Sequence, residues 1–269
     1  MIEKFICSLK KCNKLFLQSN NLKSMKANSE NSVWSDDFEV SWMEADMQGA
    51  AKLSSIFNYL QEVALQHAEK MGFGYETAMG KEQIWVVVRL LIKMKKYPTW
   101  RQKIKIKTWP RGLDGIWAFR EYIIMDENGS VLGGASSSWL VLNAKTRRPV
   151  SPEITFHALP MVNPKGALDE FSSRITPEGE MQVIDQHIIG YSEIDAYQHV
   201  NNARYIDWIT DALFKYDPDV EVNRFQINYL SEAKVNDVIN LKFSKVEDRI
   251  FIMGETDQGS TSIFLAELN

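Results

Sequence analysis

Cysteine is nearly absent from this chain. Of 269 residues only two are cysteine, Cys7 and Cys12, and both stand near the N-terminus. The rest of the chain therefore has no disulfide framework and no thiol for nucleophilic catalysis. The spacing of the two cysteines is not CxxC, and no second Cys or His pair accompanies them. We interpret them as free thiols in a reducing cytoplasm.

Long apolar runs and a strong excess of one charge are also missing. No run of 18 apolar residues occurs, so no transmembrane helix is expected. The formal net charge of -4 argues against nucleic acid as a partner. No glycine-rich phosphate loop is visible, and we expect neither a metal nor an organic cofactor. The chain is 45% hydrophobic, which is ample for a packed core in one large domain or two of ordinary size.

What the chain does contain is an internal repeat. The segment EADMQGAAKLSSIFNYLQEVA resembles the later segment EIDAYQHVNNARYIDWITDA. When Glu44 is set on Glu193, Asp46 falls on Asp195 without a gap, and the apolar pattern that follows is shared. The polar residues differ, because His199 falls on an alanine and the two asparagines after it fall on Lys and Leu. This pattern predicts a duplicated fold unit in which one active site survives.

A second pair of segments extends the repeat. Residues 89–104 align with residues 224–239 without a gap, and Ile92 then meets Ile227. The two aligned pairs are separated by different distances, which indicates a loop of changed length. Two similar units in one chain predict an internal pseudo-dimer.

Hydrophobic periodicity predicts the same order of elements in each unit. In the first unit, residues 38–42 alternate as a strand and residues 52–71 have helical spacing, with glycines at the end of the helix. Further strands are predicted at 84–94, 103–109, 117–125 and 131–142, the last two as a hairpin across an Asn-Gly turn. The second unit is predicted to have a helix at 202–215 and strands at 182–191, 224–230, 238–244, 250–255 and 261–268. The fold class is α+β, with two sheets able to join edge to edge.

These elements divide the chain into four parts. Residues 1–36 are predicted to be a disordered extension, with a targeting peptide as the alternative. Residues 37–145 form the first unit and residues 182–269 the second. Residues 146–181 form the linker, because five of the eight prolines lie in the stretch 144–181.

Several strings of the sequence resemble one enzyme family. They are WVVVRLLIKM, YPTW, KIKIKTWP, SSSWLVLNAKTRRPV and DAYQHVNNARYIDWI, and together they are similar to the fatty acyl-ACP thioesterases. The resemblance implies a tandem, or double, hotdog fold in which each unit has a long helix wrapped by an antiparallel sheet. It also implies hydrolysis of a fatty acyl thioester carried by acyl carrier protein, as in a bacterial relative of the plant enzymes.

The candidate catalytic residues cluster before the second predicted helix. Thioester hydrolysis needs a base that activates the attacking oxygen, and donors aimed at the oxyanion. Asp195 and His199 stand four residues apart, and backbone N–H groups at the helix start are unpaired. Asn201 or Asn202 is predicted to cap that helix.

The resemblance assigns roles and shows two departures. The family motif Asp-x-Asn-x-His-Val-Asn-Asn places Asp195 and His199 as the residues that direct the catalytic water, but Tyr197 stands at the central Asn. Tyr197 or a backbone amide is expected to supply that hydrogen bond. The family's Glu-Cys pair reads Glu232-Ala233, so a cysteine nucleophile cannot apply. Water activated by Asp195 and His199 with support from Glu232 is the favoured mechanism, and a carboxylate attacking to form an anhydride is the alternative.

The other polar candidates are interpreted as structural. Asp46 lacks a histidine four residues on, and His67 is expected to be a surface or satisfied helix histidine. His157 and His187 receive no function. Two alternative functions stay open: hydrolysis of acyl-CoA, and binding of acyl chains without catalysis.

Substrate contacts are predicted on two surfaces. Lys103, Lys105 and Lys107 alternate along one strand and project from one face, where they suit docking of an acidic acyl carrier protein. The family resemblance places the acyl tunnel in the first unit, and its candidate lining residues are Met71, Phe73, Ile84, Trp85, Val87 and Trp117. We expect a cytoplasmic enzyme, and the sequence leaves open a homodimer.

Overall fold

The computed structural model describes residues 33–152, 166–195, 198–257 and 261–269. Most of the predicted N-terminal extension, including both cysteines, lies outside these ranges, as do Tyr197 and His157. Within the described ranges, no helix is both long and apolar enough to cross a membrane.

One continuous sheet organises the described residues. Ten of its strands follow the order β1-β3-β4-β5-β2-β8-β11-β10-β9-β7, with β6 paired to β5 off this path. The strands of the first unit are β1 (Trp34–Glu39), β2 (Gln83–Met94), β3 (Lys103–Asp114), β4 (Trp117–Asp126), β5 (Val131–Asn143) and β6 (Pro149–Val150). Those of the second are β7 (Gln182–Ile188), β8 (Arg224–Tyr229), β9 (Val238–Val246), β10 (Arg249–Thr256) and β11 (Ser262–Leu268). The antiparallel pairs agree with the predicted α+β class.

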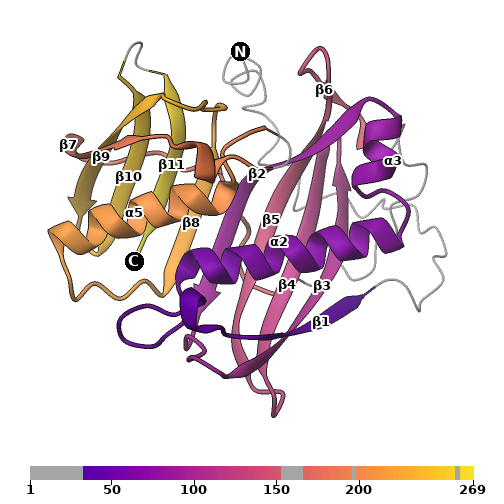
Figure 1. Cartoon of the computed structure of the whole chain (residues 1–269), viewed down its shortest axis with the longest axis horizontal. Coiled ribbons are helices and arrows are strands. Elements are labelled where there is room, and N and C mark those ends of the chain that lie inside the picture. The colour runs from indigo at the N-terminus through magenta and orange to yellow at the C-terminus, as the bar shows by residue number, and fades with distance from the viewer. Residues whose placement is uncertain (1–32, 153–165, 196–197, 258–260) are drawn as a thin grey trace.

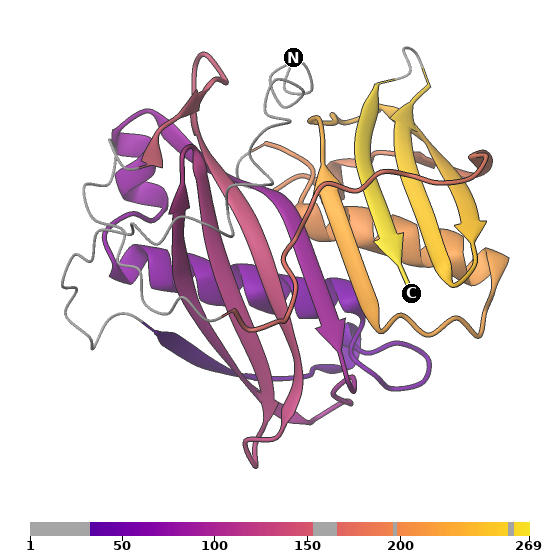
Figure 2. The same ribbon diagram turned by 180° about the vertical axis from the view of Figure 1, so that it is seen from behind.

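Two long helices lie on the same side of this sheet. They are α2 (Leu53–Lys70) and α5 (Asn202–Tyr216), and Figures 1 and 2 show the sheet behind and then in front of them. Each helix buries its apolar face: Ile56, Leu60 and Val63 of α2 are almost fully buried, as are Ile206 and Ile209 of α5. Removing such faces from water is the main driving force for packing a helix onto a sheet. The predicted double hotdog arrangement is confirmed.

The two units join through β2 and β8, which pair antiparallel. Arg89 pairs with Asn228, Lys93 pairs with Arg224, and Leu91 pairs with Gln226. Gln226 is the residue that the sequence repeat aligns with Leu91. A pseudo-twofold axis therefore passes between these two residues, which confirms the internal pseudo-dimer.

The loops that enter the two helices have the same backbone geometry. The N–H of Asp46 donates to the carbonyl of Ala50 at 2.8 Å, and the N–H of Asp195 donates to the carbonyl of His199 at 2.8 Å. Gly49 has φ 79°, and Gln198 at the matching place has φ 63°. A glycine adopts such a φ at little cost, whereas Gln198 is strained. The strain falls in the loop that carries the candidate catalytic residues.

The structure corrects several predicted boundaries. The first strand is Trp34–Glu39 rather than 38–42, because these residues pair with Thr108 to Lys103 of β3. It starts within the stretch 1–36 that was expected to be extension. The short helices η3 (Trp42–Glu44), η4 (Tyr191–Glu193) and α3 (Tyr75–Gly80) were not predicted, and β3 runs past the predicted end at residue 109 through an irregularity between Pro110 and Gly112.

The linker crosses the face of the sheet opposite the long helices. Residues 166–181 run across that face toward β7 (Figure 2). The Ser172 and Ser138 hydroxyls are 2.8 Å apart, and the guanidinium of Arg111 lies 3.7 Å from the centre of the Phe171 ring. The predicted surface connection between the units is therefore a cover for the outer face.

Candidate active site

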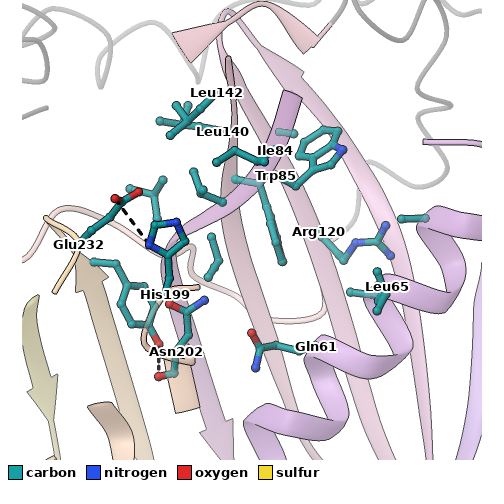
Figure 3. A pocket seen from close by; sticks show the side chains of 18 of the residues that line it. Gln61, Leu65, Ile84, Trp85, Arg120, Leu140, Leu142, His199, Asn202 and Glu232 are labelled. Atoms are coloured by element: carbon teal, nitrogen blue, oxygen red, sulfur yellow. Dashed lines mark hydrogen bonds and ion pairs between the residues drawn. The ribbon is translucent and has the colours of Figure 1, made fainter. Parts of the chain in front are cut away.

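A cavity of about 1290 Å³ lies at the junction of the two units. The first unit contributes walls from α2, β2, β4 and β5. The second contributes the loop before α5, the first residues of that helix, and the segment after β8. Figure 3 shows His199, Asn202 and Glu232 on one side of this cavity, with Gln61, Leu65 and Arg120 on another. Concave sites with apolar walls and a few polar groups are the usual form of small-molecule sites.

His199 occupies the wall of this cavity between two charged side chains. Its Nδ1 lies 3.6 Å from Oε2 of Glu232, and its Nε2 lies 3.3 Å from Nη2 of Arg147. Arg147 also donates from Nη1 to Oε1 of Glu232 at 3.2 Å. The three side chains form a triangle of charge-assisted contacts that is open to the cavity.

Arg147 was missed by the sequence reasoning as a site residue. It stands in the turn between β5 and β6, in the first unit, while His199 and Glu232 belong to the second. The available signal was the string TRRP inside one of the segments that carried the family resemblance. Nothing local to that string indicates a contact with a histidine 52 residues further on.

Asp195 lines the same cavity and is fixed through the backbone of its loop. Its Oδ1 accepts the backbone N–H of His199 at 3.4 Å, in addition to the loop hydrogen bond between their backbones. The described contacts of the imidazole ring are with Glu232 and Arg147. The structure thus brings Asp195 and His199 to one cavity wall.

Of the two asparagines predicted to cap the helix, Asn201 is the cap. Its side-chain oxygen accepts the N–H of Ala203 at 2.9 Å. Tyr229 of β8 donates from its hydroxyl to the carbonyl of Asn202 at 3.0 Å, which ties the helix start to the sheet. In the described part of the chain, the N–H of Asn202 donates to no protein acceptor. This N–H is a candidate donor for an oxyanion.

A partly buried carboxylate anchors the loop that enters α5. Glu193 accepts from the ring nitrogen of Trp208 at 2.6 Å, from the N–H of Gly190 at 2.7 Å, and contacts Nε2 of His187 at 3.0 Å. Burial raises the pKa of this carboxyl, but the bonds from His187, Gly190 and Trp208 outweigh burial and hold its pKa below the ordinary value. His187, left without a function by the sequence, therefore has a structural role.

The matching carboxylate of the first unit is Glu44. It accepts the N–H of Ser41 at 2.8 Å. Burial and then the neighbouring Glu44 raise the pKa of Tyr59, which stands where the second unit has Trp208. Both loops are thus held by the same kind of anchor, but only the second carries a histidine.

Five of the six predicted lining residues border the cavity. Phe73, Ile84, Trp85, Val87 and Trp117 line it, whereas Met71 packs behind, in the cluster of Phe73 and Trp85. The ring N–H of Trp85 donates to the carbonyl of Phe73 at 3.0 Å. Trp85 is therefore held in place by the loop that follows α2.

One polar cluster also borders the cavity. Arg120 of β4 is 7% exposed, and its Nη1 contacts Nδ1 of His67 at 3.0 Å and donates to Oγ1 of Thr108 at 3.1 Å. Burial lowers the pKa of Arg120. Figure 3 places Arg120 near Leu65, away from His199. His67 is the satisfied helix histidine that the sequence predicted, but it is buried rather than at the surface.

The three lysines of β3 do not form a purely basic face. Asp37 of β1 pairs with Lys105, with 2.7 Å between Oδ1 and Nζ, and Glu39 lies opposite Lys103 in the strand register. The sequence analysis missed this because it began the first strand at residue 38, which left Asp37 outside it, and assigned that strand no partner. Two other strands, β4 and β5, lie between β3 and β2 in the sheet, so these lysines are far along the sheet from the junction of the units.

Comparison with known families gives two matches in chain order. The acyl-ACP thioesterase N-terminal domain matches residues 31–156, and the acyl-ACP thioesterase C-terminal domain matches residues 178–264. The cavity and the triangle of Arg147, His199 and Glu232 involve residues from both matched segments.

Comparison with curated proteins gives plant relatives. Oleoyl-acyl carrier protein thioesterase 2, chloroplastic, of Arabidopsis thaliana is 28% identical over 255 residues, which cover 88% of this chain and 70% of the relative. An acyl-[acyl-carrier-protein] hydrolase, chloroplastic, of Cuphea viscosissima is 31% identical over 195 residues, which cover 67% of this chain and 47% of the relative. The chain thus spans about half the length of the second relative.

Solved structures share the fold. An acyl-ACP thioesterase from Bacteroides thetaiotaomicron has a TM-score of 0.80 at 24% identity, over 90% of this chain and 99% of that chain. The 12:0-ACP thioesterase from Umbellularia californica has a TM-score of 0.78 at 20% identity, over 88% of this chain and 96% of that chain. At these identities the likeness concerns the fold alone.

Proposed function

The chain belongs to the acyl-ACP thioesterase family, and on this basis we propose that it hydrolyses the thioester of a fatty acyl-[acyl carrier protein] to a free fatty acid and the carrier protein. The observation that supports this most is the shape of the site. A cavity with aromatic and aliphatic walls, among them Trp85, Val87 and Trp117, opens onto Asp195, His199 and Glu232. An acyl chain needs the first part and a thioester carbonyl needs the second.

In the proposed reaction, a water molecule attacks the thioester carbonyl carbon. Asp195 takes the proton of this water, and His199, which Glu232 supports through its contact with Nδ1, helps to orient the water. The N–H of Asn202 at the start of α5 is aimed, in this proposal, at the oxyanion that develops. Collapse of the intermediate breaks the carbon–sulfur bond, and the carrier's thiolate takes up the proton.

Neither cysteine takes part in this proposal. Ala233 follows Glu232 where the family has a cysteine, and it is buried against the core. The remaining alternative is attack by a carboxylate, which forms an anhydride. Single turnover in water labelled with heavy oxygen separates the two. Direct attack puts the labelled oxygen in the fatty acid, whereas an anhydride that water opens at the protein's own carbonyl leaves the labelled oxygen in the protein.

The substrate class is tested with matched thioesters. The purified protein is assayed with the same acyl chain on acyl carrier protein and on CoA, and with acyl chains of several lengths. We expect a higher kcat/KM for the carrier-bound chains. A higher value for the CoA thioester contradicts the choice of carrier, and no turnover of any thioester, with binding retained, contradicts the reaction itself.

The partner and the location belong to the same proposal. The partner is an acidic acyl carrier protein, and the lysines of β3 remain a proposed contact for it despite their pairing with acids of β1. We place the reaction in the cytoplasm, and cell fractionation tests that placement.

A further inference from the structure

Arg147 reaches from one unit into the catalytic cluster of the other. Its Nη1 donates to Oε1 of Glu232 at 3.2 Å, and its Nη2 lies 3.3 Å from Nε2 of His199. A planar guanidinium can bridge two acceptors in this way, whereas a lysine ammonium offers a single point of charge. The two neighbours of Arg147 in this cluster both lie in the second unit.

The turn that carries Arg147 is held in an uncommon backbone conformation. Arg147 has φ 55°, in the left-handed region that residues with a side chain rarely adopt. Asn143 fixes the turn, because its Oδ1 accepts the N–H groups of Lys145 and Thr146 at 3.1 and 2.8 Å. The N–H of Arg147 donates to the carbonyl of Asn143 at 2.9 Å. Strain of this kind persists where the surrounding structure determines it, and it collects at functional sites.

The contact does little for stability. The side chains of Arg147 and Glu232 are each 45% exposed. Ion pairs at this exposure are screened by water and stabilise a fold only weakly. The contact therefore matters through what it orders rather than through the stability that it adds.

What Arg147 orders is the proton on His199. A guanidinium only donates hydrogen bonds, so Nε2 of His199 must accept. The proton of the neutral ring then lies on Nδ1, which faces Oε2 of Glu232 at 3.6 Å. The hydrogen bond made by one ring nitrogen sets the state of the other.

The degenerate loop of the first unit has no such arrangement. The sequence repeat sets Ala50 on His199 and Tyr97 on Glu232. The hydroxyl of Tyr97 donates to the carbonyl of Val222 at 2.8 Å, so it serves the packing between the units. The acceptors that Arg147 engages are therefore found in the second unit and not at the matching positions of the first.

We propose that Arg147 is a positioning residue supplied by the first unit, which fixes His199 in the tautomer protonated on Nδ1 and holds Glu232 against it. This inference rests on the proposed thioesterase function and deepens it. The catalytic centre is then shared between the two units, although the residues that resemble the family motif all lie in the second.

The test combines kinetics with nitrogen NMR of the histidine rings in the full chain. The variant is Arg147→Met, which keeps length and removes the donors. The matched control is Lys145→Met in the same turn, whose described partner is Glu82 rather than a residue of the cluster. The chain has 4 histidines, so the His199 signals are identified by their loss in His199→Ala.

In the wild type and the control we expect the tautomer protonated on Nδ1. In Arg147→Met we expect Nε2 to become protonated in part or in full, and kcat to fall about 10- to 100-fold with KM nearly unchanged, the scale known for groups that orient a functional histidine. Arg147→Lys should recover part of kcat, since it restores one donor. The Arg147→Met effect should shrink when Glu232 is already Gln, because the two residues act together.

An unchanged tautomer, or an unchanged kcat in folded Arg147→Met, overturns the proposal. A raised KM with kcat intact also overturns it, because Arg147 then serves substrate binding. If Arg147→Met does not fold, Arg147→Lys carries the test, and a wild-type tautomer with full kcat in that variant refutes the need for a bidentate guanidinium. If the wild type hydrolyses no acyl-ACP, the proposed function fails, while the tautomer measurement still decides the role of Arg147.

Discussion

The two matched loops allow catalysis to be separated from folding by one substitution made twice. Asp46 and Asp195 occupy equivalent places, with the same backbone hydrogen bond closing each loop at 2.8 Å. Only Asp195 lines the cavity beside His199. Replacing each with Asn keeps the shape and an acceptor oxygen and removes the charge.

The cost in stability is expected to be at least as large for Asp46→Asn as for Asp195→Asn. Oδ1 of Asp46 accepts the N–H groups of Gln48 and Ala50 at 3.0 and 2.9 Å, and Oδ1 of Asp195 accepts that of His199 at 3.4 Å. A hydrogen bond to a charged acceptor exceeds one to a neutral acceptor by about 1 kcal/mol. Each substitution should therefore lower stability by about 1–2 kcal/mol, which in a chain of this size lowers Tm by roughly 2–8 °C.

The cost in turnover is expected to differ by orders of magnitude. Asp195→Asn should lower kcat on acyl-ACP by about two to four orders of magnitude, the scale for loss of a general base or its partner. Asp46→Asn should change kcat far less. The double variant Asp195→Asn, His199→Ala should be little worse than either single variant, because residues acting as a unit are not additive.

The assay measures kcat on an acyl-ACP that carries one defined acyl chain, and thermal melts are recorded for every variant. If activity followed stability alone, Asp46→Asn would be impaired as much as Asp195→Asn. Near wild-type turnover in folded Asp195→Asn, or inactivity confined to Asp46→Asn, would refute the assignment of the active site to the second unit.

Three further predictions concern the anchor, the docking face and the thiols. The pKa of Glu193 is depressed in the folded state, so its contribution to stability is present above its ordinary pKa of 4.5 and is lost as pH falls through the folded value. Glu193→Gln should therefore lower Tm at pH 7 and lose less on acidification, and parallel melting curves of variant and wild type would contradict this. Replacing the three lysines of β3 with Gln should raise KM for acyl-ACP and spare a short acyl-pantetheine, whereas equal losses on both exclude docking there. Alkylating both cysteines should leave turnover nearly intact. Inactivation of the wild type by alkylation, absent from a Cys7→Ser, Cys12→Ser variant, would contradict the water mechanism.

Local sequence was sufficient for the two long helices, for most of the strands and for part of the candidate site. The helical spacing of residues 52–71 and the alternation in the strands are properties of short segments, and both were predicted within a few residues. Asp195, His199 and Asn201 were found because one loop carries all three. The repeat also predicted two similar units whose sheets could join edge to edge, as β2 and β8 do.

Tertiary structure alone decided what crosses between segments. The net charge of the face that carries Lys103, Lys105 and Lys107 depends on β1, and the sequence of neither strand alone shows that β1 pairs with β3. The buried contact of His67 with Arg120 joins a helix to a strand 53 residues away. Arg147 meets His199 and Glu232 only because the β2–β8 pair brings the two units edge to edge and a strained turn aims one side chain across the junction. Periodicity records which face of a segment is buried, but side-chain contacts between distant segments follow from how those faces pack, and that is set by the whole fold.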